Sequence, residues 1–222
     1  KYCDDPRYLS MKSFALTGNA YGRDFAFDKV PHELDPLDPA AYNDSPVRVV
    51  AVSSNLETGE ADYHEITDYE KDTPYLIATS SMPLVSQIVE VDGKKLLDGG
   101  PCDSVPLDYS LATGTKKQIV VLTQAANYKK QPNKLMALMR TAYGDYPYFC
   151  ERVEYRHYEY NRLYRRLQRE ADEGNIFLIR PQKAVEIDHM ERDPEKLLDL
   201  YGQGYEQAIE TWNALQTYLA KP

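Results

Sequence analysis

Two periods of apolar residues alternate along this chain, and they predict strands and helices in turn. Short runs rich in β-branched residues predict six strands, at residues 47–54, 61–66, 87–91, 94–97, 118–123 and 175–179. The runs at 47–54 and 118–123 are almost continuously apolar, which is typical of strands buried on both faces of a parallel or mixed sheet. We therefore expect an α/β fold in which helices cover both faces of a mixed, largely parallel central sheet.

Apolar residues at helical spacing predict the elements between these strands. A helix over 68–79 has Asp68 as its N-cap, with a start at Pro74 in the N1 position as the alternative. A long helix follows Pro147, with its many charged residues expected on a solvated face. A short helix over 106–112 lies between two predicted strands, at the spacing of a βαβ unit. Prolines between residues 31 and 46 are expected to prevent long regular elements there. The whole segment of residues 1–46 is predicted to be a packed connector, with a cover over a site as the alternative.

The last predicted helix begins at Pro194, after an N-cap at Asp193. Its apolar stripe contains Leu198, Tyr201, Tyr205, Ala208, Trp212, Leu215 and Leu219. Gly202 and Gly204 weaken this helix by about 1 kcal/mol each relative to alanine. We expect these two glycines to allow the helix to approach the sheet closely.

A predicted hairpin ends in a motif that contains a candidate functional residue. Asp92-Gly93 joins two of the strands and indicates a two-residue turn, because both turn positions require positive φ. The second strand ends in Asp98-Gly99-Gly100, where the glycines let the chain turn away without a Cβ clash. Asp98 is thereby expected at the rim of the sheet. Taken alone, such an aspartate is expected to form only an Asx-turn.

A longer pattern surrounds this motif. A helix end rich in small residues, then Pro83, the hairpin, Asp98-Gly99-Gly100 and Asp103-Ser104-Val105-Pro106 follow one another in order. This order resembles the bacterial branch of the patatin-like phospholipase family. Weaker matches extend the resemblance over nearly all 222 residues, among them Arg7-Tyr8, Thr17-Gly18, Ser53-Ser54-Asn55, Thr58-Gly59 and Glu191-Arg192-Asp193-Pro194.

The resemblance implies a function and a role for Asp98. In that family the aspartate of this motif is the second member of a Ser-Asp catalytic dyad, with the two glycines, here Gly99 and Gly100, as motif support. It implies hydrolysis of lipid esters or phospholipids: a serine attacks the ester carbonyl, the aspartate takes its proton, and water then releases the acid. It also implies a three-layer α/β/α fold, a lipid ester as substrate, transient contact with a membrane surface, and no cofactor or metal.

The nucleophile of such an enzyme is not in this chain. Family members carry a glycine-rich oxyanion loop and a Gly-x-Ser-x-Gly elbow, whose strained turn has no room for side chains, and no serine here has glycines two places before and after it. The chain also starts at Lys1 rather than at a methionine. We therefore expect residues 1–222 to be one domain, the C-terminal part of a patatin-like domain, incomplete at its N-terminal side and inactive alone.

Two alternatives to an enzymatic function remain open. The first is a non-catalytic patatin-like module that binds lipid or a protein partner. The second is an unrelated α/β protein in which Asp-Gly-Gly occurs by chance. The retained Asp98 favours the enzyme, because a module without catalysis has no need of that carboxylate.

Composition and charge argue against several further classes of function. The net charge of −9 argues against a nucleic-acid surface and against a polybasic membrane anchor, and no apolar run approaches the roughly 18 residues of a membrane span. A cytoplasmic, reducing compartment is expected, because there is no Cys-x-x-Cys among Cys3, Cys102 and Cys150. No metal-ligand spacing is found among His32, His64, His157 and His189. The sequence sets no oligomeric state.

Overall fold

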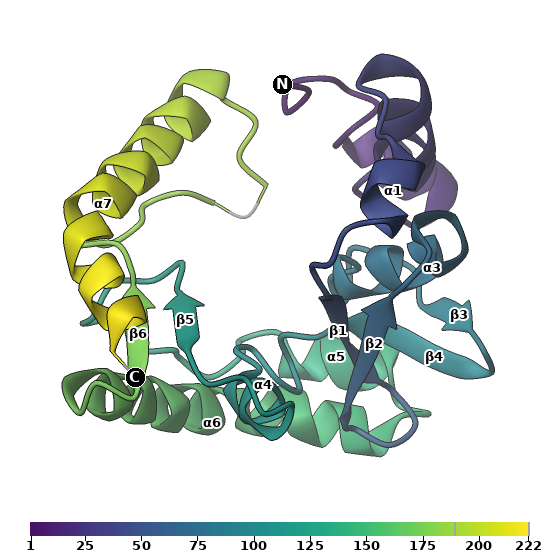
Figure 1. Cartoon of the computed structure of the whole chain (residues 1–222). Coiled ribbons are helices and arrows are strands. Elements are labelled where there is room, and N and C mark those ends of the chain that lie inside the picture. Colours follow the sequence, from purple (N-terminus) through teal and green to yellow (C-terminus); the bar gives the residue numbers. More distant parts are fainter. Residues whose placement is uncertain (189, 222) are drawn as a thin grey trace. The chain divides into compact units, whose positions relative to one another are not determined.

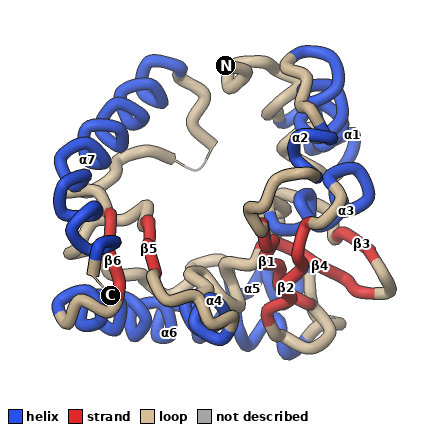
Figure 2. Tube along the Cα trace, in the orientation of Figure 1, coloured by secondary structure: helices blue, strands red, loops and turns tan. Residues whose placement is uncertain are grey.

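All six predicted strands are present in the computed structural model, which describes residues 1–188 and 190–221 (Figures 1 and 2). His189, one of the four histidines considered above, lies outside the described residues. The strands are β1 (Val49–Asn55), β2 (Ala61–Ile66), β3 (Val89–Val91), β4 (Lys94–Asp98), β5 (Gln118–Val121) and β6 (Ile176–Ile179). The helices are α1 (Met11–Thr17), the π-helix η1 (Phe25–Leu34), α2 (Pro39–Asn43), α3 (Tyr69–Thr79), α4 (Leu107–Ala112), α5 (Met136–Ala142), α6 (Pro147–Asp172) and α7 (Pro194–Ala220). The predicted mixed α/β composition is confirmed.

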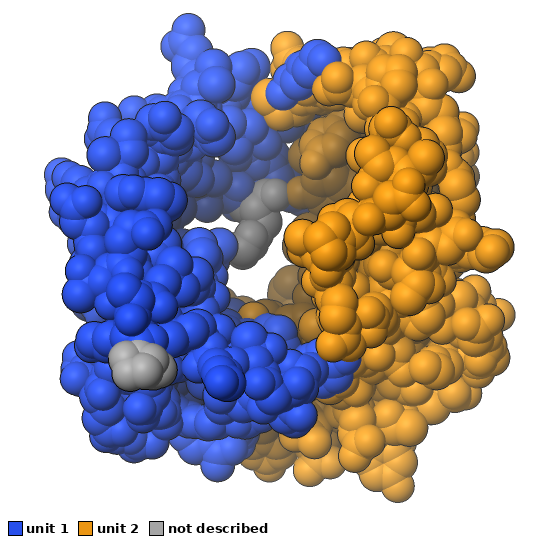
Figure 3. Space-filling model, viewed as in Figure 1, with its two compact units in different colours: residues 1, 105–131, 157–222 blue, residues 2–104, 132–156 orange. Residues whose placement is uncertain are grey.

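The chain divides into two compact units, which are coloured separately in Figure 3. Unit 1 contains residues 1, 105–131 and 157–222, and unit 2 contains residues 2–104 and 132–156. Helix α6 contributes its first ten residues to unit 2 and the others to unit 1. The expectation of one domain over residues 1–222 stays a prediction.

The sheet of unit 2 is antiparallel throughout. Its strand order is β2-β1-β4-β3, and each neighbouring pair runs antiparallel. Short turns join β1 to β2 and β3 to β4, and only antiparallel strands can be joined in this way. The expected largely parallel central sheet is therefore not found among the described residues, where only β5 and β6 pair in parallel.

The turn between β3 and β4 has the predicted geometry. Asp92 has a φ of 49° and Gly93 a φ of 73°, as a two-residue hairpin of this type requires. The Asp92 carboxylate also accepts a hydrogen bond of 2.7 Å from the hydroxyl of Tyr75 on α3. The hairpin is thus fixed both by its own backbone and by the helix that packs against it.

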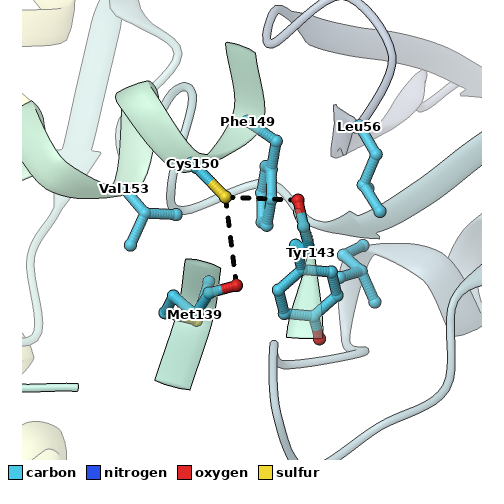
Figure 4. Packing of buried hydrophobic residues seen from close by; sticks show 7 residues of the cluster. Leu56, Met139, Tyr143, Phe149, Cys150 and Val153 are labelled. Atoms are coloured by element: carbon cyan, nitrogen blue, oxygen red, sulfur yellow. Dashed lines mark hydrogen bonds between the residues drawn. The ribbon is translucent and has the colours of Figure 1, made fainter. Parts of the chain in front are cut away.

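Helices cover both faces of this sheet, as expected. Leu96 and Leu97 are adjacent in β4, so their side chains lie on opposite faces, and both are fully buried. Leu96 belongs to a cluster with α3 residues, whose other buried members are Ala51, Ile66, Tyr75, Ala78 and Val89. Leu97 belongs to a second cluster with α5 and α6, whose other buried members, most of them shown in Figure 4, are Leu56, Met139, Tyr143, Phe149, Cys150 and Val153.

Helix α3 starts where its cap predicts. Asp68 precedes the helix, and its carboxylate accepts a hydrogen bond from the backbone N–H of Lys71. Pro74 lies inside the helix, so the alternative start at that residue is wrong. Pro31 is buried inside η1, but residues 31–46 contain only the end of η1 and the five-residue α2. The expectation that prolines prevent long regular elements in this range is therefore confirmed.

Unit 1 is built around the two parallel strands. Val120 and Leu122 pack with Ile176 of β6 and with Leu107, Tyr164 and Leu167. Strand β5 pairs with β6, so the predicted βαβ unit that would join β4 to β5 in one sheet is not formed. Only one face of β5 is buried: the exposed fraction is 8% for Val120, 45% for Ile119 and 70% for Val121. The expectation of burial on both faces is therefore wrong for this strand.

Candidate functional site

Asp98 is the last residue of β4, and its backbone is held from two sides. Its N–H donates a hydrogen bond of 2.8 Å to the carbonyl of Ser81, and its carbonyl accepts one of 2.7 Å from the hydroxyl of Ser54. In the sheet it stands opposite Ser53. The position of its Cα is therefore fixed by the sheet and by the segment that follows α3.

The carboxylate of Asp98 is tied to the loop that follows. Its Oδ1 accepts a hydrogen bond of 2.7 Å from the backbone N–H of Gly100, which is the Asx-turn that the sequence predicted. The side chain is half-buried, with part of its surface open to solvent. The turn thus orients the carboxylate without removing it from solvent.

The two glycines of the motif are required for different reasons, and neither has positive φ. A Cβ on Gly99 would lie 2.3 Å from the carbonyl oxygen of Val52 in β1, so no side chain fits there. A Cβ on Gly100 would lie 2.6 Å from Nη2 of Arg156 and 2.8 Å from Oδ1 of Asp98. Gly99 therefore permits a close backbone contact, and Gly100 leaves room for a guanidinium beside the carboxylate.

Helix α6 supplies one arginine to the loop after Asp98 and a second to the β1–β2 turn. Nη2 of Arg156 lies 3.4 Å from the hydroxyl of Ser104, which itself donates a hydrogen bond of 2.6 Å to the carbonyl of Gly100. Arg152 donates from Nε to the carbonyl of Gly59 at 2.9 Å. These contacts connect the loop and the β1–β2 turn to the same helix.

Two further side chains stabilise the loop. Cys102 donates from its thiol to the carbonyl of Gly59 at 3.4 Å, and burial raises the pKa of that thiol. A thiol of raised pKa stays protonated at neutral pH, so Cys102 is a packing residue rather than a nucleophile. The hydroxyl of Tyr63 in β2 donates to Oδ2 of Asp103 at 2.6 Å.

The N-terminal segment packs against the residues that hold Asp98. Nη2 of Arg23 donates to the Ser81 hydroxyl at 3.2 Å and also to the carbonyl of Gln87. Asn19 accepts a hydrogen bond of 2.9 Å from the N–H of Gln87. Burial lowers the pKa of Arg23. This segment thus contacts Ser81, the residue whose carbonyl accepts the hydrogen bond from the N–H of Asp98.

The serines that contact Asp98 are closed to a substrate. The exposed fraction is 1% for Ser53, 0% for Ser54 and 3% for Ser81. A nucleophilic serine must reach the carbonyl carbon of a bound ester, which these buried hydroxyl groups cannot do. They serve the local structure instead, since Ser54 and Ser81 donate to backbone carbonyls.

Sequence reasoning located Asp98 but missed the arginines beside it. Arg152 and Arg156 were expected only to solvate a helix face, and this is wrong for both, because each donates to a turn or loop within its own unit. Their spacing of four residues places them on one side of α6 and was the only local signal. That signal could not identify their partners, which lie 52 and 93 residues away along the chain.

Residues 1–188 and 190–221 contain no group of three or more His, Cys, Asp or Glu side chains that could hold a metal ion. His64, in β2, stacks on the ring of Tyr75 with 3.4 Å between centroids, and its Nε2 lies 3.1 Å from Asp72. None of the described helices combines the length and the apolar character needed to cross a bilayer.

Comparison with known proteins gives a family match that does not include Asp98. A family model described as a domain of unknown function (DUF6363) matches residues 146–220, which contain α6, β6 and α7. No curated protein matches the chain. The matched region is less than half of the chain, and its description names no activity. What the chain is similar to is thus a family without a stated function, over its C-terminal part.

Proposed function

We propose that this chain supplies the general base of a serine acyl hydrolase that acts on lipid esters, and that Asp98 is this base. The observation that carries the proposal is the way Asp98 is held at the end of β4, between Ser81 and Ser54, with a following residue that can only be glycine. A general base needs a fixed position relative to the proton it takes. The resemblance of the Asp98-Gly99-Gly100 region to the patatin-like phospholipases supports the same role.

In this proposal the nucleophilic serine belongs to a segment outside residues 1–222. Two observations support this: the chain has no Gly-x-Ser-x-Gly elbow, and the serines against Asp98 are buried. The same segment would extend the two-stranded sheet of β5 and β6 into the larger, mostly parallel sheet of a three-layer fold. The exposed side chains of Ile119 and Val121 favour this extension, because parallel sheets are normally covered on both faces.

The chemistry follows from the two groups of the dyad. As the serine oxygen attacks the ester carbonyl, its proton passes to the carboxylate of Asp98. Asp98 then returns the proton to the leaving alcohol, and the acyl group stays on the serine. A water molecule attacks this acyl-enzyme and gives a proton to Asp98, and Asp98 returns that proton to the serine oxygen as the acid is released. The cycle balances without a metal or a cofactor.

The remaining expectations belong to the same proposal. Residues 1–222 would be the C-terminal part of one patatin-like domain, which meets its lipid substrate by transient contact with a membrane surface. The three free thiols, at Cys3, Cys102 and Cys150, favour a reducing compartment, so we propose the cytoplasm as its location.

The test compares the full product of the encoding gene with the chain of residues 1–222. We expect the full product to hydrolyse p-nitrophenyl esters, and residues 1–222 alone to show only background turnover. In the full product, Asp98→Asn should lower kcat by at least roughly 10²-fold, because the amide cannot take the serine proton. Folding should survive with a loss of at most about 1–2 kcal/mol. A folded Asp98→Asn protein that retains more than about a tenth of the parental kcat would remove Asp98 from the mechanism.

A matched control separates a loss of charge from a loss of the base. Asp103 lies in the same loop and accepts a hydrogen bond from Tyr63, so Asp103→Asn removes a nearby carboxylate without touching the proposed base. We expect Asp103→Asn to leave kcat within about threefold of the parent and to lower the thermal midpoint modestly. Equal losses of kcat in the two variants would show that the loop, not the Asp98 carboxylate, is what activity depends on.

A non-catalytic role for Asp98 is the second candidate, and one contact favours it. The hydrogen bond from the Gly100 N–H already gives the carboxylate a structural function. In that case the full product has no ester turnover, and Asp98→Asn lowers the thermal midpoint while binding of lipid or a protein partner is kept. The two candidates therefore differ in the activity of the unmodified full product.

A further inference from the structure

Helix α7 carries an apolar stripe with the spacing of a coiled-coil seam. Leu198, Tyr205, Trp212 and Leu219 recur every seven residues, and Tyr201, Ala208 and Leu215 fall between them at steps of three and four. This pattern is sustained over three heptads, which is typical of a helix that pairs with another helix. The stripe is nevertheless exposed: the exposed fraction is 67% for Leu198, 70% for Tyr201 and 56% for Trp212.

The helix contacts its own unit through a neighbouring face. Tyr218 is 6% exposed, and its hydroxyl accepts a hydrogen bond from the N–H of Gln118 and donates one to the carbonyl of Asn175. These contacts fix the C-terminal part of α7 beside β5 and β6 (Figure 1). The apolar stripe is therefore not the face of α7 that contacts the sheet.

Two glycines in the middle of α7 have no packing reason within the described residues. No atom lies within 4 Å of the position that a Cβ would take on Gly202 or Gly204. The prediction that these glycines let α7 approach the sheet closely is therefore wrong. Glycine weakens a helix interior relative to alanine. Missing side chains beside an exposed apolar stripe are what a second, closely approaching helix would need.

We propose that α7 is a self-association surface, on which α7 of a second copy of this chain packs antiparallel. One register pairs Leu198 with Leu215, Tyr201 with Trp212, and Tyr205 with Ala208 of the partner subunit. By two-fold symmetry the same pairs form twice. Large side chains then face smaller ones at the centre, and Gly202, beside Tyr201, leaves room for the indole of Trp212 of the partner subunit.

The distribution of large and small side chains along α7 favours the antiparallel orientation of a second copy. The bulky Trp212 lies on one half of the stripe, and the open position at Gly202 lies on the other half. In an antiparallel pair, Trp212 of each copy lies against the open position at Gly202 of the other copy. A parallel pair would instead place Trp212 against Trp212 and leave both openings empty. The antiparallel pair also opposes the two helix dipoles.

Charge and area both permit this contact. The acidic residues of α7 beyond its first turn are Asp199, Glu206 and Glu210, and in the heptad they take outer positions away from the seam. Two chains of net charge −9 can therefore meet without like charges in contact. Six large apolar side chains of α7 are each at least 41% exposed. At about 100 Å² each they approach the ~800 Å² that a stable dimer buries per partner.

The test uses the chain of residues 1–222, in which Trp212 is the only tryptophan. Sedimentation equilibrium measures the mass, and tryptophan emission measures the burial of Trp212. We expect the mass to double with rising concentration, with a parallel shift of the emission to shorter wavelength. A chain that stays monomeric with red-shifted emission overturns the proposal. A monomer with blue-shifted emission also overturns it, because another part of the chain then covers the stripe.

One variant separates docking from folding. Gly202→Leu fills the opening for Trp212 of the partner subunit, while leucine is a better helix former than glycine and meets nothing within 4 Å in the single chain. We expect a dissociation constant at least roughly tenfold higher and a thermal midpoint of the monomer that is not lowered. The matched control Gln203→Leu adds the same side chain on the outer face and should leave the dissociation constant unchanged. Equal dimerisation in both variants refutes the proposed register and surface.

Discussion

The turn after Asp98 depends on one glycine, and its replacement gives a quantitative test of the structure. In Gly99→Ala the new Cβ would lie 2.3 Å from the oxygen and 2.7 Å from the carbon of the Val52 carbonyl. Both atoms are backbone, so β1 and the end of β4 must move apart. The same carbonyl accepts a hydrogen bond of 2.6 Å from Thr79, which this movement would lengthen.

The magnitude follows from these two effects. Overpacking of this kind costs about 1–3 kcal/mol, and a weakened hydrogen bond adds about 1 kcal/mol. For a chain of this size each kcal/mol lowers the thermal midpoint by roughly 2–4 °C. We therefore expect Gly99→Ala to lower the midpoint by about 5–15 °C, measured by circular dichroism. An unchanged midpoint would refute the close contact between Gly99 and Val52.

Gly100→Ala is the matched comparison. Its Cβ would meet the ends of two side chains, at 2.6 Å from Arg156 and 2.8 Å from Asp98, and side chains can rotate away. We expect a loss below about 1 kcal/mol, so the midpoint of Gly100→Ala should stay clearly above that of Gly99→Ala. The reverse order would mean that the guanidinium and the carboxylate, rather than the backbone contact, hold the turn.

Two further predictions concern single polar contacts. Tyr63→Phe removes the 2.6 Å hydrogen bond to Asp103 and should lower the free energy of unfolding by about 1–2 kcal/mol in urea denaturation, whereas no change would show that solvent replaces the bond fully. The N–H of Asp193, with further support from Lys196, lowers the pKa of Glu191 from 4.5 to about 2, so its stabilisation is present above pH 4.5 and is lost as the pH falls towards 2. Thermal midpoints between these pH values should therefore fall less steeply in Glu191→Gln than in the parent, and parallel curves would contradict the lowered pKa.

Local patterns in the sequence were sufficient to locate the strands, but not their partners. The run before Asp98 ends at the residue that the Asp-Gly-Gly motif predicts, and the Asp92-Gly93 turn has the required φ values because its chemistry is contained in two residues. Pairing is a long-range property. Strand β5 pairs with β6, whose first residue comes 58 positions after Gln118, and no window of the sequence encodes that choice.

The candidate site shows the same division between local and distant information. Asp98 and its two glycines could be predicted because they form one motif. Arg152 and Arg156 could not, since a charged residue on an amphipathic helix has the same local pattern whether it faces water or a loop. The stripe of α7 was found from its spacing, but periodicity identifies an apolar face without identifying what covers it.

The exposed face of β5 gives a last prediction. It tests whether this strand is buried on one face, as in the structure, or on both faces, as its apolar run predicted. Val120 and Val121 are neighbours in one strand, yet 8% of Val120 and 70% of Val121 is exposed. If the structure is right, Val120→Ala leaves a cavity in the cluster with Ile176 and costs about 1–3 kcal/mol, whereas Val121→Ala stays within about 0.5 kcal/mol of the parent. Urea denaturation of residues 1–222 measures both. Equal costs would mean that Val121 is also buried, as the continuous apolar run predicted, and would contradict the one-sided strand. If the proposed nucleophile segment covers this face, the cost of Val121→Ala should rise towards that of Val120→Ala in the full gene product, because Val121 is then buried on folding and its truncation removes contacts.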